Sequence, residues 1–434
     1  MEKSNFSFDK RVESLGLNKS DKVLIAYSGG GDSTFLLMQA LNYFYDGNIY
    51  VAYVDYHDSE YTPEEEKIVL DFIRDKNIKF FRKDVYLSWK ESNFEARARD
   101  IRYKFFKDIV LKENLKGVLV AHHANDDAET YLFQKSRGSI TDELGLKSIS
   151  ILYGISVYRP LLPIKKSDII KYLNDNDIIY FDDPTNKNWN RSRDRLRMSV
   201  LSSDDNVDKT LEQRNRDSIK NDEEIEKANE FLNKNRYEFK EYSKLSINIQ
   251  RRFLYKAIQI LIGKEDNDMV VSTMNICFEF LKSNRTESLK LNDELYLYKD
   301  KDEFYFGSPI ELNDSYSFEI DRPGIYDFNS IHLDLSNPSL YKINKFPVFI
   351  KAVKKGDMIS TDLESKDGWL CMKKHGVPTY LRGFYPALYN KEGNIIYLPF
   401  YGDDKFYINV SRIYPKNKSI DIVNIFSISL TEIE

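Results

Sequence analysis

The chain has 434 residues, of which 41% are hydrophobic and 31% charged, so it can form buried cores and is not a disordered tail protein. Its length predicts about three domains of roughly 150 residues each. A formal net charge of −5 excludes a protein that is basic overall, although not one with locally basic faces.

No stretch approaches the roughly 18 consecutive apolar residues that cross a bilayer. Charges occur throughout residues 1–21, so we predict no secretory signal and no membrane partner. The two cysteines, Cys277 and Cys371, are far apart, which excludes a disulfide framework, a cysteine-rich zinc site and a CxxC redox motif. We therefore expect a cytoplasmic protein.

The first 200 residues predict alternating strands and helices. Apolar runs indicate four strands, at 23–27, 49–54, 79–85 and 117–121. Helical patterns lie between and after them, at 33–45, 63–77, 93–114 and 125–136. This alternation predicts an α/β domain at 1–200, with a Rossmann-like parallel sheet covered by helices on both faces.

Beyond residue 200, the composition and the predicted secondary structure change at about residue 201 and again at about residue 287. Residues 201–286 are polar and poor in glycine and proline, which predicts a small helical domain, with helices at 221–236 and 248–261. The segment 204–216 is either a linker or a solvated helix. Paired strands at 295–298 and 303–306, with turn signals at 321–324 and 390–394, then predict a β-rich connecting region at 287–345 and a mixed α+β C-terminal domain at 346–434.

A glycine-rich loop, SGGGDS at 28–33, follows the first predicted strand and opens a helix. Glycines let the backbone approach a ligand, and the helix N-terminus favours an anion, which makes a phosphate site. The candidate ligands are Ser28, Gly29, Gly30, Gly31, Asp32 and Ser33. Asp32 indicates a bridging Mg²⁺, because a carboxylate does not favour bare phosphate. The alternative is a tight strand-to-helix turn.

The loop matches neither of two common nucleotide motifs. A Walker loop would need Gly-Lys-Ser/Thr, and a dinucleotide fingerprint starting at Gly29 would need glycine where this chain has Thr34. The segment resembles the PP-loop of the ATP pyrophosphatases. That resemblance implies a Rossmann-like PP-loop domain that cleaves ATP to AMP and pyrophosphate.

A second motif, HHANDDAET at 122–130, follows the fourth predicted strand. If Asn125 caps a helix, Asp126, Asp127 and Glu129 lie in or near its first turn, where the helix dipole tolerates carboxylates. Asp126 and Glu129 are three residues apart and so share one helix face. Ligands in open α/β sheets bind at the carboxyl ends of strands, which makes this segment a candidate site.

Three interpretations of this motif stay open. It could form a metal centre from two histidines and two acids, namely His122, His123, Asp126 and Asp127. It could be a capped helix with solvated acids. We favour the third, recognition of a cationic substrate and of the nucleotide being activated, because a carboxylate pair binds an ammonium ion well.

HHANDDAET is similar to the HHxDDQAET motif of the tRNA(Ile)-lysidine synthetase family. Asp126 and Glu129 are retained, whereas Asn125 replaces an Asp and Asp127 replaces a Gln. Further segments also resemble the family: 93–106 is similar to its EAxARxxRYxFF helix, 159–162 to RPLL, and 182–197 to DPSN followed by RNxxR, with Ser192 in place of an Asn. Shorter matches lie at 355–357, 372–382 and 393–399.

Two regions carry local positive charge. Residues 187–197 hold five positive charges and one negative charge beside Trp189, which suits a phosphate backbone and a stacked base. The alternative is the charged start of a helix. Residues 346–418 contain 12 basic and 7 acidic residues, so the C-terminal domain is a candidate tRNA-binding module.

The resemblance implies ATP, L-lysine and tRNA(Ile) with a CAU anticodon as substrates, with Mg²⁺. The oxygen at ring position 2 of the wobble cytidine would attack the α-phosphate, and the side-chain amine of lysine would then displace AMP to give lysidine. Catalytic residues would be Asp32, Asp126, Glu129 and Arg97, with Asp32 also holding Mg²⁺. Contacts to substrate or tRNA would come from Arg99, His123, Arg191, Arg195, Lys373, Lys374 and Arg382.

Three other functions compete with this one. A PP-loop tRNA thiolase carries sulfur on cysteines, and residues 1–200 contain none. A metal-dependent phosphohydrolase would bind its metal at His122 and His123. A non-catalytic ATP- or tRNA-binding module would release no AMP. The oligomeric state stays open, with a homodimer as one candidate.

Overall fold

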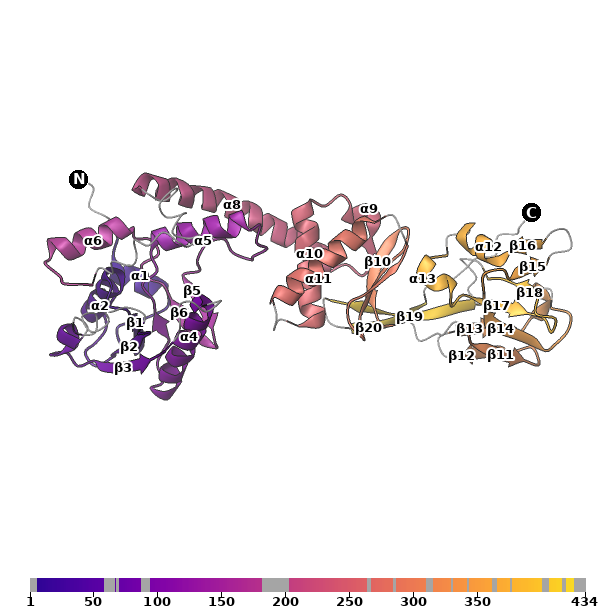
Figure 1. Cartoon of the computed structure of the whole chain (residues 1–434), viewed down its shortest axis with the longest axis horizontal. Coiled ribbons are helices and arrows are strands. Elements are labelled where there is room, and N and C mark those ends of the chain that lie inside the picture. Colours follow the sequence, from indigo (N-terminus) through magenta and orange to yellow (C-terminus); the bar gives the residue numbers. More distant parts are fainter. Residues whose placement is uncertain are drawn as a thin grey trace. The chain divides into compact units, whose positions relative to one another are not determined.

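A computed structural model describes residues 6–57, 67, 70–86, 94–181, 203–263, 267–283, 286–309, 315–328, 331–341, 343–360, 365–374, 377–399, 406–415 and 419–424. The chain divides into two compact units, Met1–Asp222 and Glu223–Glu434, which are described separately below (Figure 1). Within the described residues, no helix combines the length and apolarity needed to cross a membrane.

The first unit is built on a six-stranded sheet in the order β3-β2-β1-β4-β6-β5. The pairs are parallel except for the antiparallel β5–β6 hairpin at one edge. The strands are β1 (Val23–Tyr27), β2 (Ile49–Asp55), β3 (Lys79–Asp84), β4 (Val118–Leu119), β5 (Ile149–Leu152) and β6 (Ile155–Tyr158).

Helices cover both faces of this sheet. They are α1 (Phe8–Ser14), α2 (Gly31–Tyr43), α4 (Phe94–Lys112), α5 (Ala124–Ser136), α6 (Lys166–Asp175) and the first part of α8 (Asp204–Leu232). Val23 and Ile25 of β1 pack in one core with α1, α2 and α6, whereas Leu24 packs in a second core with α4. Alternate residues of a strand point to opposite faces, so the all-apolar run at 23–27 serves both cores. The predicted parallel α/β domain is confirmed.

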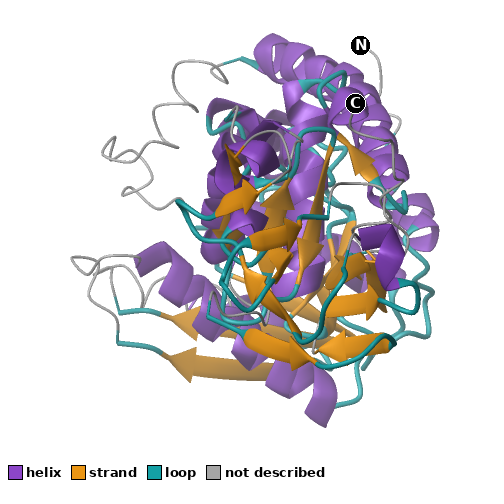
Figure 2. Cartoon of the chain, turned by 90° about the vertical axis from the view of Figure 1, so that its right-hand side faces the viewer, coloured by secondary structure: helices purple, strands orange, loops and turns teal. Residues whose placement is uncertain are grey.

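The second unit begins with helices and continues with strands. Its helices are the end of α8, α9 (Phe239–Tyr242), α10 (Ile247–Ile262), α11 (Asn267–Lys282), α12 (Gly368–Lys374) and α13 (Thr379–Arg382), with a 3₁₀ turn η2 (Pro338–Tyr341). One sheet runs β12-β13-β19-β10-β9-β8, with β20 on β19 and β7 on β10; the other runs β11-β14-β17-β18-β15-β16. Figure 2 colours these strands orange.

The strands of the first of these sheets are β7 (Tyr237–Glu238), β8 (Ser288–Lys290), β9 (Tyr296–Lys299), β10 (Glu303–Gly307), β12 (Ile325–Phe328), β13 (Ile331–Asp334), β19 (Phe406–Tyr414) and β20 (Ser419–Asn424). Those of the second are β11 (Ser317–Ile320), β14 (Val348–Ala352), β15 (Met358–Ser360), β16 (Ser365–Asp367), β17 (Pro386–Tyr389) and β18 (Ile395–Tyr397). The predicted pairing of β9 with β10 is confirmed.

Several elements differ from the sequence predictions. The segment 204–216 belongs to the long helix α8, so the linker alternative is wrong. The helices α1, α6 and α11 and the β5–β6 hairpin were not predicted, and most of the helix expected at 63–77 lies outside the described residues. β11 pairs with β14 and β13 with β19, across the predicted boundary at 345/346. The division into four domains stays a prediction.

Candidate active site

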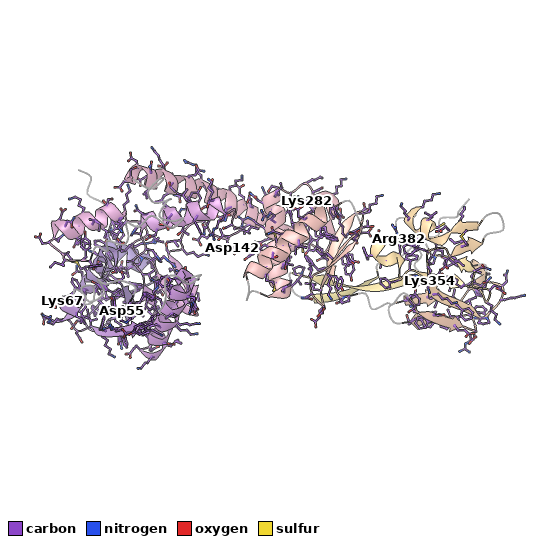
Figure 3. The ribbon with its side chains drawn as sticks, in the orientation of Figure 1. Asp55, Lys67, Asp142, Lys282, Lys354 and Arg382 are labelled. Atoms are coloured by element: carbon purple, nitrogen blue, oxygen red, sulfur yellow. The ribbon has the colours of Figure 1, made fainter. Side chains whose placement is uncertain are left out.

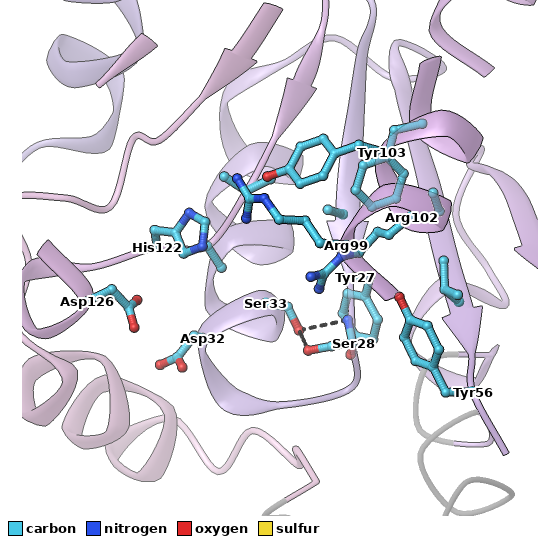
Figure 4. A pocket seen from close by; sticks show the side chains of 16 residues that line it. Tyr27, Ser28, Asp32, Ser33, Tyr56, Arg99, Arg102, Tyr103, His122 and Asp126 are labelled. Carbon is cyan, nitrogen blue, oxygen red and sulfur yellow. Dashed lines mark hydrogen bonds between the residues drawn. The ribbon is translucent and has the colours of Figure 1, made fainter. Parts of the chain in front are cut away.

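The candidate site lies where the order of the strands reverses. β1 leads through α2 to β2 on one side, while β4 lies on the other side of β1, and a crevice at the carboxyl ends of such strands is the usual ligand site. A cavity of about 250 Å³ occurs there. Its polar lining comes from the glycine loop, from α4 and from the start of α5: Ser28, Asp32, Ser33, Arg99, Arg102, His122 and Asp126 (Figure 4).

The glycines of the loop meet different requirements. Gly29 has a φ of +82°, which L side chains rarely adopt, and its carbonyl accepts a hydrogen bond from Phe181 N at 3.0 Å. A Cβ on Gly31 would lie 3.1 to 3.3 Å from side-chain carbons of α6 and Tyr180. A Cβ on Gly30 would meet nothing closer than Ser28 Oγ at 3.6 Å. Packing within the protein therefore does not require glycine at position 30, and the close approach of a ligand is the remaining reason for it.

The two serines close the loop around the start of α2. Ser28 N donates to Ser33 Oγ at 3.2 Å, and Ser33 Oγ donates to Gly30 O at 2.9 Å. Both hydroxyls face the cavity in Figure 4. With the N–H groups that begin α2, they form a set of donors suited to an anion.

His123 joins the two predicted motifs. Its Nε2 lies 3.5 Å from Asp32 Oδ2 and 3.5 Å from Asp126 Oδ2, and its backbone N–H donates to Asp126 Oδ2 at 3.0 Å. Burial opposes protonation of His123, but the two carboxylates outweigh it and raise the pKa of His123. Burial likewise opposes ionisation of Asp32, yet His123 and Lys166 hold the pKa of Asp32 below its ordinary value.

The acidic motif begins α5 differently from the prediction. His123, not Asn125, is the N-cap residue, and Asn125 Oδ1 instead accepts a hydrogen bond from Lys166 N at 3.0 Å, at the start of α6. Asp126 and Asp127 do lie in the first turn of α5. Asn125 therefore ties α5 to α6, a contact between distant segments that the sequence does not reveal.

Asp127 is buried and is not among the residues that line the cavity. It is 3% exposed, and its Oδ1 accepts a hydrogen bond from Leu146 N at 2.7 Å while its Oδ2 lies 3.2 Å from an Arg214 nitrogen on α8. Burial raises the pKa of Asp127, although Leu146 and Arg214 oppose this shift. The role of Asp127 is to connect segments of the first unit.

The metal-centre interpretation gains no support in the described part of the chain. There, the one group of three potential ligands that gather closely is Asp55, His57 and Asp84, at the ends of β2 and β3. Both carboxylates of that group already pair with Arg82 at 2.9 Å.

The arginines of α4 divide between two faces of the helix. Arg99 and Arg102, three residues apart, line the cavity, and Arg99 also lies over the Tyr103 ring at 4.7 Å from its centroid. Arg97 is exposed and is not among the residues that line the cavity. From the sequence we predicted roles for Arg97 and Arg99 but none for Arg102. Its spacing of three residues from Arg99 would have indicated that the two share a helix face.

The other predicted residues are placed as follows. Glu129 is 5% exposed on α5, one turn after Asp126, and does not line the cavity. Arg191 and Arg195 lie outside the described residues. In the second unit, Lys373 and Lys374 are exposed in the last turn of α12. Arg382 of α13, labelled in Figure 3, donates from Nε to Val377 O at 2.8 Å.

Arg159 and His122 form a contact that the sequence did not suggest. Arg159 Nε donates to His122 Nδ1 at 3.1 Å, although the two residues are 37 positions apart. Burial lowers the pKa of His122 to about 4, and the positive charges of Arg159, Arg99 and Arg102 add to this effect against the opposing Asp126. His122 is therefore neutral at pH 7.

The fold, the glycine loop and the cavity at the switch point define a PP-loop domain, and the sequence model of that domain family matches residues 2–203. The tRNA(Ile)-lysidine synthase of Mycoplasma mycoides subsp. mycoides is 33% identical over 319 residues, which span 69% of this chain and 78% of that protein. The enzyme of the same name from Thermosipho africanus is 25% identical over 93% of this chain and 94% of that protein. The chain belongs to the tRNA(Ile)-lysidine synthase family and is an enzyme.

Among solved structures, the U34-tRNA thiolase NcsA from Methanococcus maripaludis, with its 4Fe-4S cluster, aligns with 48% of this chain and 76% of that chain. The sequence identity is 15% and the TM-score is 0.40.

Proposed function

We propose that this enzyme uses ATP to attach L-lysine to ring position 2 of the wobble cytidine in the CAU anticodon of tRNA(Ile). The products are lysidine, AMP and pyrophosphate. Membership in the tRNA(Ile)-lysidine synthase family makes the chain an ATP-dependent ligase that modifies tRNA. The observation that carries the proposal is that one cavity is lined by three residues of the glycine loop, by Arg99 and Arg102, and by Asp126.

In the first step, the cytidine oxygen attacks the α-phosphate of ATP and pyrophosphate leaves. The N–H groups at the start of α2 and the hydroxyls of Ser28 and Ser33 suit the phosphates. Arg99 and Arg102 supply positive charge where negative charge develops on the transferring group. These contacts favour the transition state without any covalent role for the protein.

Asp32 is the residue that fits Mg²⁺. Its Oδ1 is buried and has no hydrogen-bond partner among the described residues, and a carboxylate oxygen is the ligand type that Mg²⁺ prefers. When bound, Mg²⁺ would neutralise charge on the phosphates. The partners of Asp32 Oδ2, His123 and Lys166, keep the carboxylate ionised for that role.

In the second step, the side-chain amine of lysine attacks ring position 2 and AMP leaves. We propose that Asp126 and Glu129 hold the lysine ammonium, and that a carboxylate accepts the proton that the amine must lose before it attacks. Asp126 lines the cavity, and Glu129 lies one turn further along α5. The position of Asp126 in the cavity lining supports this assignment, whereas Glu129 is buried behind it on the same helix.

The tRNA itself would contact further basic residues. For this purpose we propose Arg191 and Arg195, which belong to the sequence range 1–200, and Lys373, Lys374 and Arg382 of the second unit. A substrate of this kind supports a cytoplasmic location. A homodimer stays a proposal that light scattering of the purified enzyme tests.

Replacing Asp126 by Asn tests whether this carboxylate acts in the attack of lysine and not in the adenylation of the tRNA. We expect Asp126→Asn to release pyrophosphate in the presence of ATP and tRNA at nearly the normal rate, while lysine incorporation falls at least ~100-fold. The matched control is Asp168→Asn, which changes an exposed carboxylate on α6. Normal lysine incorporation by Asp126→Asn would discard the assignment.

A further inference from the structure

The hydrogen bond between Arg159 and His122 determines which nitrogen of His122 carries a proton. An arginine side chain stays protonated in proteins and can only donate hydrogen bonds. Because Arg159 Nε donates to His122 Nδ1 at 3.1 Å, Nδ1 must be the unprotonated acceptor. The proton of a neutral His122 is therefore on Nε2.

Arg159 is held rigidly enough to impose this state. It is 3% exposed, its Nη1 donates to Lys147 O at 2.7 Å and to Ser150 Oγ at 2.8 Å, and its backbone N–H donates to Ser148 O at 2.8 Å. The fixed cation beside Nδ1 also disfavours a second proton on the ring. This agrees with the low pKa of His122 described above.

The other nitrogen of the ring is available to a ligand. His122 lines the cavity, and Figure 4 shows it between Asp126 and Arg99. Among the described residues, His122 Nε2 has no hydrogen-bond partner. The cavity also holds Arg99, Arg102 and the serines of the phosphate loop, so an anionic group is the ligand that its surroundings favour.

We propose that Arg159 locks His122 as the Nε2–H tautomer, and that His122 donates this hydrogen bond to a phosphoryl oxygen of the nucleotide in the cavity. The proposal rests on the proposed function, because it requires the nucleotide to bind there. His122 acts as a neutral donor that keeps its proton, and Arg159 is a positioning residue. The bond strengthens as charge develops on the phosphoryl oxygens.

Nitrogen NMR of the whole enzyme tests the tautomer without any assay of activity. Protein labelled with ¹⁵N in its histidine rings would be compared with the same preparation of His122→Gln, so that the missing signals identify His122. We expect an unprotonated Nδ1 and a protonated Nε2 throughout pH 6 to 8. An Nδ1–H tautomer or a doubly protonated ring in that range would overturn the proposal.

Two matched variants test the hydrogen bond to the nucleotide. The amide of His122→Asn reaches only the position of Nδ1, so it accepts from Arg159 but donates nothing to the cavity, whereas the longer His122→Gln reaches the position of Nε2. We expect kcat for tRNA adenylation to fall ~10²–10³-fold in His122→Asn and no more than about 10-fold in His122→Gln. Equal rates for the two variants would overturn the donor role.

A variant of Arg159 tests its positioning role. Arg159→Lys keeps a positive charge but loses the fork that reaches Lys147, Ser150 and His122 together, so the His122 signals should show a mixture of tautomers. Unchanged His122 signals would refute the lock. If wild-type enzyme made no lysidine, the proposed function would fail, and the NMR result on the tautomer would still stand by itself.

Discussion

At the level of single residues, we expect glycine to be needed for packing at position 31 and for ligand binding at position 30. A Cβ at position 31 would press on Ile170, Leu173 and Tyr180, so Gly31→Ala should lower the free energy of unfolding by ~1–3 kcal/mol. Gly30→Ala should leave it within ~0.5 kcal/mol but weaken ATP binding, because its methyl group lies beside Ser28 at the cavity. Urea denaturation and calorimetric ATP titration measure the two effects. Equal losses of stability would contradict this account.

Asp127 replaces the Gln of the family motif, and its contacts predict what restoring the Gln would do. Asp127→Gln, which restores the residue of the HHxDDQAET motif, should lower the free energy of unfolding by about 2 kcal/mol, because Arg214 loses its charged partner. The double variant Asp127→Gln with Arg214→Gln should recover part of that loss. Urea denaturation measures both. Full stability of the single variant would show that the ion pair contributes nothing.

The site residues differ in how far the sequence could identify them. The loop 28–33 and Asp126 carry local signals, namely glycines after an apolar strand and acids at a helix start. Asp126 and three residues of the loop, Ser28, Asp32 and Ser33, line the cavity. Arg102 follows from its spacing to Arg99. The pairing of His122 with Arg159 could not be predicted, since it depends on how β4 and β6 place segments 37 residues apart.

At the scale of elements, α5 is joined to α8 by a polar cluster around Asp217. Its Oδ2 accepts hydrogen bonds from Tyr131 Oη at 2.6 Å and Lys135 Nζ at 2.9 Å, and its Oδ1 accepts one from Gln213 Nε2 at 2.8 Å. These bonds lower the pKa of Asp217 to about 2 against the opposing effect of burial. Because α5 also carries Asp126, this cluster fixes to α8 a helix that contributes to the lining of the cavity.

The cluster predicts a dependence of stability on pH. The pKa of Asp217 in the folded protein, about 2, lies below its ordinary value of 3.8, so the unfolded chain takes up the proton first as pH falls. The stabilisation is present above pH 3.8 and is lost as pH falls toward 2. In urea denaturation between pH 5 and 2, Asp217→Asn should show a shallower loss of stability than the wild type. Parallel curves would contradict the assignment.

The elements themselves were predictable to different degrees. The strands at 23–27 and 49–55 are apolar runs, and parallel strands buried on both faces require such runs. The start of α8 at Asp204 was ambiguous, because a polar helix resembles a linker until its few buried positions, such as Val207, find partners on α5. Short strands such as β8 depend on partners that no local pattern specifies.

At the scale of the whole molecule, a chain of net charge −5 must use local positive charge to bind tRNA. Replacing both Lys373 and Lys374 by Ala should raise KM for tRNA without changing kcat, because these exposed lysines would contact phosphates but not the reacting atoms. The slope of log affinity against log salt should fall by about 1.5. Lys391→Ala, at an exposed turn, is the control, and an unchanged salt slope in the double variant would exclude the contact.

The most direct test follows labelled lysine, AMP and tRNA together. Purified enzyme would be incubated with ATP, Mg²⁺, labelled L-lysine and a tRNA(Ile) transcript with a CAU anticodon, beside elongator tRNA(Met) as the control. We predict that label enters only tRNA(Ile), with one lysine incorporated for each AMP released. AMP release without lysine incorporation, or label in both tRNAs, would contradict it.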